Sequence, residues 1–118
     1  GDVFGSGKIV VRQDAKVKVT GAAVYTGNTE IDRGEFWIGA GGSLTNASQV
    51  YVGNGGSPAD LAKLWIEAGG TTVSNNITVN PGNTGKRVIG GLNSSGTALY
   101  TGALTLNVLS LLMTRVIR

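Results

Sequence analysis

The sequence of 118 residues contains neither cysteine nor histidine. Their absence excludes disulfide bonds, zinc sites built from Cys and His ligands, thiol nucleophiles and the commonest general base at neutral pH. Most hydrolase triads are excluded for the same reason. Any acid-base catalysis by this chain would therefore have to depend on carboxylates.

Charged residues and prolines are also scarce. Charged side chains make up 14% of the chain, against about a quarter in an ordinary domain, and only two prolines occur. The net charge of +3 comes from scattered residues such as Lys16 and Arg87, so no basic run indicates a nucleic-acid partner. No apolar run reaches the roughly 18 residues that cross a bilayer. We expect no nucleic acid, no membrane span, no metal and no cofactor.

Glycine and apolar residues are abundant instead. The chain has 20 glycines and is 41% hydrophobic, enough for the core of one domain. Apolar residues alternate with polar ones in several short segments, and Gly or Asn/Gly clusters separate these segments. The segments with alternation are residues 16–20, 30–32, 35–38, 49–52 and 63–67. This pattern predicts an all-β fold of short strands joined by frequent turns.

One segment recurs late in the chain. Residues 20–32, TGAAVYTGNTEID, align without gaps on residues 95–107, SGTALYTGALTLN. A solenoid with about three coils of roughly 25 residues would explain the interval between the two segments, whereas a β-sandwich predicts no recurrence. The inward positions of such coils would stack in one apolar column. We predict that this column contains Val17, Val19, Ile31, Phe36, Ile38, Val50, Val52, Leu64, Ile66, Ile77, Val79, Leu104 and Leu106.

Residues 15–39, AKVKVTGAAVYTGNTEIDRGEFWIG, resemble the autotransporter-associated β-strand repeat. Arg33 and Trp37 depart from the residues usual in that repeat. The resemblance implies a right-handed parallel β-helix in a secreted bacterial passenger or surface protein, and therefore an extracellular or cell-surface location. It implies no single activity.

Two parts of the chain are distinguished on this basis. Residues 1–107 are expected to form the β-solenoid repeats. Residues 108–118 lack the regularly placed glycines of the preceding segments and are expected to form an apolar cap or an oligomerisation tail. Because an open solenoid end exposes unpaired backbone groups, we expect a homo-oligomer or a capped end.

Strict alternation places both tryptophans on the outer surface. Trp37, Tyr51 and Trp65 are evenly spaced along the chain, which indicates an aromatic row suited to binding a sugar. Glu35 and Glu67 flank this row and are the candidate catalytic acid and base. A glycosidase needs two carboxyl groups about 5–5.5 Å apart for retention or about 6.5–9.5 Å apart for inversion. Glu30 and Asp32 are a second candidate pair.

Three interpretations of this face remain open. The leading hypothesis is a structural or adhesive segment of a secreted β-helix, serving as a rigid stalk or surface-interaction module. The alternative is a small carbohydrate-active module that binds a polysaccharide or cell-surface ligand, or hydrolyses glycosides through carboxylates. In the simplest interpretation, the aromatic rings pack on one another or in a subunit interface, and the carboxylates are paired with basic residues. The expected basic partners are Lys16, Lys18, Arg33 and Lys63.

Overall fold

The computed structural model describes residues 5–44, 49–53, 61–80 and 87–107. These residues form thirteen β-strands and no helix, and every strand pairing is parallel. The prediction of an all-β fold is confirmed. In the described part of the chain there is consequently no helix that would cross a membrane.

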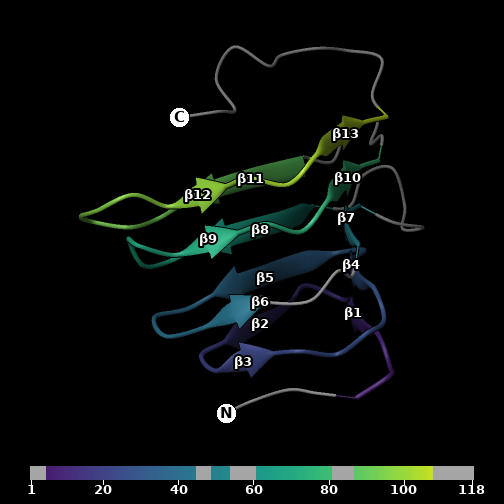
Figure 1. Cartoon of the computed structure of the whole chain (residues 1–118). Coiled ribbons are helices and arrows are strands. Elements are labelled where there is room, and N and C mark those ends of the chain that lie inside the picture. Colours follow the sequence, from purple (N-terminus) through teal and green to yellow (C-terminus); the bar gives the residue numbers. More distant parts are fainter. Residues whose placement is uncertain (1–4, 45–48, 54–60, 81–86, 108–118) are drawn as a thin grey trace.

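The strands are distributed over four sheets (Figure 1). The first sheet has the order β1 (Ile9–Val11), β4 (Thr29–Ile31), β7 (Val50–Val52), β10 (Ile77–Val79), β13 (Leu104–Leu106). The second has the order β11 (Arg87–Gly91), β8 (Ala62–Ile66), β5 (Gly34–Ile38), β2 (Ala15–Val19). Two smaller sheets pair β3 (Ala22–Ala23) with β6 (Ser43–Leu44) and β9 (Thr72–Val73) with β12 (Leu99–Tyr100).

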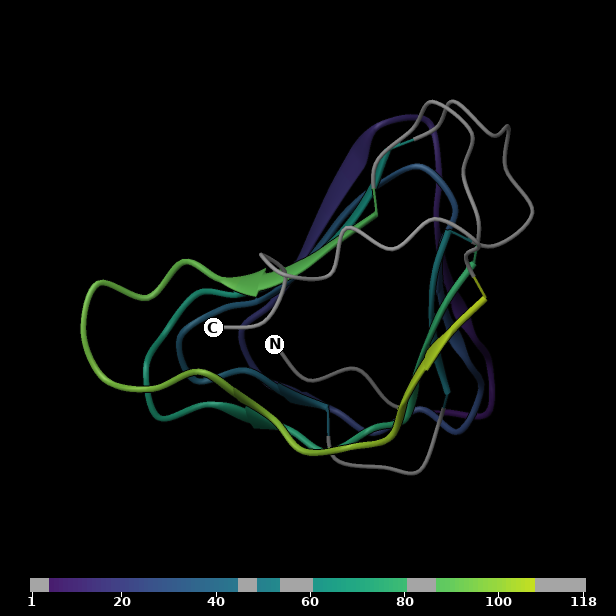
Figure 2. The same cartoon turned by 90° about the horizontal axis from the view of Figure 1, so that it is seen from above.

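The chain runs through these sheets repeatedly in the same order, and we call each such run, from one strand of the first sheet to the next, a passage. From above, successive passages follow the same three-sided outline (Figure 2). Thr29, Val50, Ile77 and Leu104 begin successive strands of the first sheet, and the first interval between them is shorter than the other two. The interval between the recurring segments, residues 20–32 and 95–107, therefore spans three passages of unequal length. On the third side, β6 and β9 lie close together without forming one sheet.

The core lies between the sheets and contains the predicted apolar column. Phe36 is opposite Val17 and Leu64, so three passages supply side chains to one layer. Ile31, Phe36 and Leu64 are completely buried. The prediction fails at the two ends of the stack. Leu104 is 39% exposed, and Val17 and Leu106 are only partly buried, because no further described passage covers β2 and β13.

The corner before β5 requires a glycine. Gly34 has φ of 135°, a conformation that residues with a side chain rarely adopt. A Cβ at this position would lie 2.3 Å from the carbonyl oxygen of Ala15, which is its partner in β2. Close parallel pairing between the first two passages therefore depends on the missing side chain.

We expect Gly34→Ala to lower the free energy of unfolding by about 3 kcal/mol or more, through backbone strain and the clash with Ala15. Gly7→Ala is the matched control, because a Cβ there would meet no atom within 4 Å. Urea unfolding followed by far-UV circular dichroism measures both. Equal stability of the two variants would show that β2 and β5 are not paired as described.

Two tyrosines occupy equivalent positions in the repeated segments. The hydroxyl of Tyr25 is hydrogen-bonded to that of Thr29, and the hydroxyl of Tyr100 donates to the carbonyl oxygen of Gly90 at 2.7 Å. Burial raises the pKa of both phenols, against the opposing effect of these hydrogen bonds. The neutral phenol is therefore the form that the folded state favours.

This predicts a loss of stability in alkali. Unfolded tyrosine ionises near pH 10, so the stabilisation from the buried phenols is complete below pH 10 and is lost as the pH rises above it. Urea midpoints measured from pH 8 to 11 should fall less steeply in the Tyr25→Phe/Tyr100→Phe double variant than in the wild type. Parallel pH profiles would contradict the burial of these hydroxyls.

Candidate functional site

The outer side of the second sheet carries both predicted tryptophans and Glu35. Lys16 and Lys18 lie on β2, Glu35 and Trp37 on β5, and Lys63 and Trp65 on β8. We call these six residues the tryptophan face. The strand register places Trp37 opposite Trp65, and places Glu35 between Lys16 and Lys63. These side chains point outward because their neighbours along each strand fill the core.

The two tryptophans form one cluster with a single carboxylate. Their ring centroids are 6.2 Å apart and their planes are inclined at 52°. Oε1 of Glu35 accepts hydrogen bonds from Nε1 of Trp37 at 3.0 Å and from Nε1 of Trp65 at 3.1 Å. One carboxylate oxygen therefore joins two indoles that belong to successive passages of the chain.

Lysine side chains cover one tryptophan of this cluster. Nζ of Lys16 lies 3.9 Å from the ring centroid of Trp37, and Nζ of Lys18 lies 5.4 Å from it. Both distances are within the range of cation–π attraction. The face of Trp37 under these lysines is consequently not open to a sugar ring.

The partner of Glu67 differs from that of Glu35. Oε1 of Glu67 binds Nζ of Lys18 at 2.9 Å in an exposed ion pair. The backbone N–H of Glu67 donates to Ile38, which places Glu67 level with Gly39. Gly39 is four positions after Glu35, or about 13 Å along the strand direction.

The register places Glu35 and Glu67, the predicted acid and base, in β5 and directly after the neighbouring β8, but not opposite each other. Glycoside hydrolysis requires their carboxyl groups to be roughly 5–9.5 Å apart, and their pairing as acid and base stays a prediction. Their hydrogen bonds also direct the two side chains to different partners, the indoles and Lys18. The arrangement is that of two separate polar contacts.

Tyr51 lies outside the tryptophan face, and the expectation of a row of three aromatics is corrected. It belongs to β7 in the first sheet, opposite Glu30 and Thr78. The residues from Trp37 to Tyr51 make up less than one passage, so they end in another sheet. The interval from Trp37 to Trp65 is twice as long, completes one passage and aligns the two rings.

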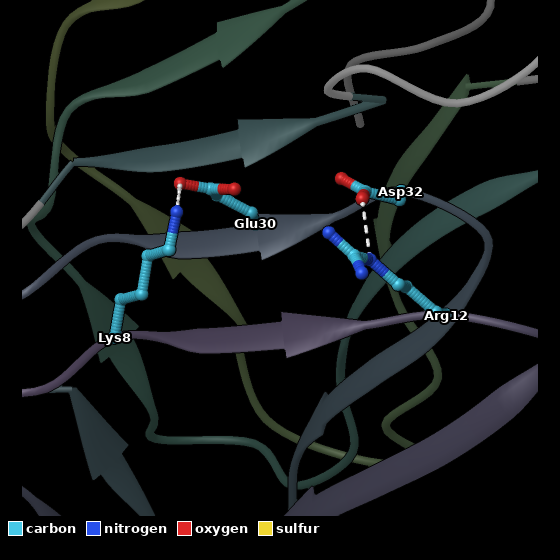
Figure 3. Close-up of polar contacts among 4 residues, drawn as sticks. All are labelled: Lys8, Arg12, Glu30 and Asp32. Carbon is cyan, nitrogen blue, oxygen red and sulfur yellow. Dashed lines mark hydrogen bonds and ion pairs between the residues drawn. The ribbon is translucent and has the colours of Figure 1, made fainter.

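The second pair of carboxylates is mostly buried and already neutralised (Figure 3). Nζ of Lys8 is 3.1 Å from Oε2 of Glu30, and Nε of Arg12 is 3.2 Å from Oδ2 of Asp32. Both carboxylate side chains are 11% exposed. Oδ1 of Asp32 is buried without a protein hydrogen bond, a position suited to an ordered water molecule.

The sequence analysis named most of the acidic residues of these ion pairs but only some of their basic partners. Lys8 and Arg12 were not identified as partners, although each precedes its carboxylate by one passage, 22 and 20 residues. Lys18 was expected to pair with a carboxylate and does so. Arg33 was also expected to do so, and it binds Asp14 through two nitrogens, at 2.9 and 2.8 Å.

Comparisons with protein-family models, with curated proteins and with solved structures find no match to this chain. Within the described residues, no group of three or more acidic side chains could hold a metal ion. The function must therefore be argued from the contacts themselves.

We expect the two carboxylates of the second sheet to differ in their effect on stability. Glu35→Ala removes two hydrogen bonds from half-buried indoles and should cost about 1–3 kcal/mol. Glu67→Ala removes an exposed ion pair and should cost less than about 1 kcal/mol. Urea unfolding measures both, and the tryptophan emission spectrum should change only in Glu35→Ala. Equal changes in the two variants would contradict the role of Glu35 as the shared acceptor.

Proposed function

We propose that this chain is a segment of a right-handed parallel β-helix that serves as a rigid structural or adhesive scaffold in a secreted or surface-exposed bacterial protein. Parallel pairing in register and the recurring order of strands support the helical part of this proposal. Right-handedness follows from the strong preference of parallel crossover connections. The resemblance of residues 15–39 to the autotransporter-associated repeat supports the location.

One observation carries the scaffold function. Each of the five described carboxylates is bound to a cation or an indole from another passage. These residues are Asp14, Glu30, Asp32, Glu35 and Glu67. The acidic side chains on this surface therefore connect one passage to another. An acid-base catalyst instead needs carboxylates that are free to contact a substrate.

A second candidate is glycan binding at Trp65, which a specific contact favours. The ring of Trp65 lies over Gly90, where a Cβ would be 2.9 Å from the indole. The indole of Trp65 therefore extends from β8 across the backbone of β11, and the residue remains only half-buried. Aromatic rings exposed in this way are suited to packing against apolar sugar faces.

We expect the purified protein to hydrolyse none of a panel of chromogenic glycosides and polysaccharides, and its tryptophan fluorescence to be unchanged by soluble oligosaccharides. Turnover that Glu35→Gln or Glu67→Gln abolishes would refute the scaffold proposal in favour of an enzyme. A saturable fluorescence change that disappears in Trp65→Phe would establish the second candidate. Trp37→Phe is the control, because Lys16 and Lys18 cover its ring.

A further inference from the structure

β11, β12 and β13 form one end of the stack (Figure 1), and no described strand pairs with the outer edge of β11. Leu92, Leu99 and Leu104 are 47%, 46% and 39% exposed. A cavity of about 800 Å³ opens at this end, and its lining includes Ile77, Ile89, Ala98 and Tyr100. Leu104 is the clearest case of this exposure, because the residues in register with it in the three preceding strands of the first sheet, Ile77, Val50 and Thr29, are buried. Leu99, in contrast, lies opposite Thr72, which is also exposed.

The internal repeat shows what such a surface normally contacts. Leu106 corresponds to Ile31 when residues 95–107 are aligned on residues 20–32. Ile31 is completely buried because Val52 of the next passage lies opposite it in β7. Leu106 has the same place in its own passage, but no described strand lies beyond it. The surface is therefore built to be covered by another parallel strand.

We propose that the open edge of β11 is the docking surface for residues 109–113 of the same chain, as a fifth parallel strand of the second sheet. Residues 108–118, for which the sequence predicts a cap or an oligomerisation tail, lie outside the described residues. β13 belongs to the first sheet, and each earlier strand of that sheet from β1 to β10 is followed along the chain by a strand of the second sheet. The proposal depends on the observed register and is independent of the scaffold function.

The proposed register uses the shortest link that precedes a strand of the second sheet, since the links before β8 and β11 have nine and seven residues. The link from β4 to β5 has two residues, from Ile31 to Gly34. The same link after Leu106 starts the new strand at Leu109, opposite Arg87. Positions 109, 111 and 113 then point inward, as Gly34, Phe36 and Ile38 do in β5.

The side chains of residues 109–113 fit this register, but they do not fit the register shifted by one residue. With the two-residue link, Leu109, Leu111 and Met113 face the cavity while Ser110 faces solvent. With the three-residue link found between β1 and β2, Ser110 and Thr114 would be buried instead. Burial of apolar side chains favours the first arrangement. It also places Leu112 beside Gly90, next to the indole of Trp65.

Backbone geometry provides a test within β11 itself. The N–H of Leu92 donates to Ile66 in β8. Alternate residues of a strand direct their amides to opposite edges, so Val88 and Gly90 face β8, and Ile89 and Gly91 face the open edge. Pairing with residues 109–113 should protect the amides of Ile89 and Gly91 from exchange with solvent.

We would measure amide hydrogen exchange by NMR in the full chain and in a variant that ends at Asn107. In the full chain, the amides of Ile89 and Gly91 should exchange about as slowly as those of Val88 and Gly90. Truncation should accelerate Ile89 and Gly91 at least about tenfold more than the control amides. Rapid exchange of Ile89 and Gly91 in the full chain would overturn the proposal.

Two substitutions in the full chain keep the test valid if the truncated chain does not fold. Leu111→Asp places a charge in the cavity and should deprotect Ile89 and Gly91, whereas Ser110→Asp faces solvent and should leave them protected. Equal effects of the two changes would overturn the register. Protection that appears only at high protein concentration would show that a second copy of the chain occupies the edge, and would also overturn the proposal.

Discussion

The structure depends on parallel backbone pairing in register between successive passages of the chain. This pairing stacks residues of equal register about 4.8 Å apart, so that Val17, Phe36 and Leu64 form one layer of the core. The same register brings outward side chains into contact. Gly34 shows how tight the constraint is, because even one methyl group there would meet the carbonyl of Ala15.

Polar contacts on the outside follow the same geometry as the core. Lys8 meets Glu30 and Arg12 meets Asp32 because each pair occupies neighbouring levels of adjacent passages. Glu35 extends this principle by accepting from one indole on its own strand and from another on β8. Partly buried contacts of this kind lose less strength to solvent than exposed pairs do. The surface of the stack therefore reinforces the register that the core establishes.

Much of this fold is predictable from alternation and glycine spacing, but the meeting of distant residues is not. The inward positions Phe36, Ile38 and Leu64 and the span of three passages follow from patterns in the sequence. Contacts between passages depend on passage length, which varies because the links before β8 and β11 are longer than those before β2 and β5. The even spacing of the aromatic residues consequently suggested a row that includes Tyr51, whereas Tyr51 lies on another sheet.

The two open edges of the second sheet differ in charge. This difference affects how readily each edge can pair with another chain. The β2 edge carries Lys16 and Lys18 on its outer side, and lysine on an edge strand discourages pairing with another chain. The β11 edge has Val88 and Gly90 at the matching positions, and neither carries a charge. The only charged residue of β11, Arg87, lies at the beginning of the strand and donates to the carbonyl oxygen of Asn80. The rest of this edge is therefore more open to pairing with another strand than the β2 edge is. Since the adjoining segment begins with alternating leucines at the appropriate distance, intramolecular cover explains the asymmetry more simply than a second copy does.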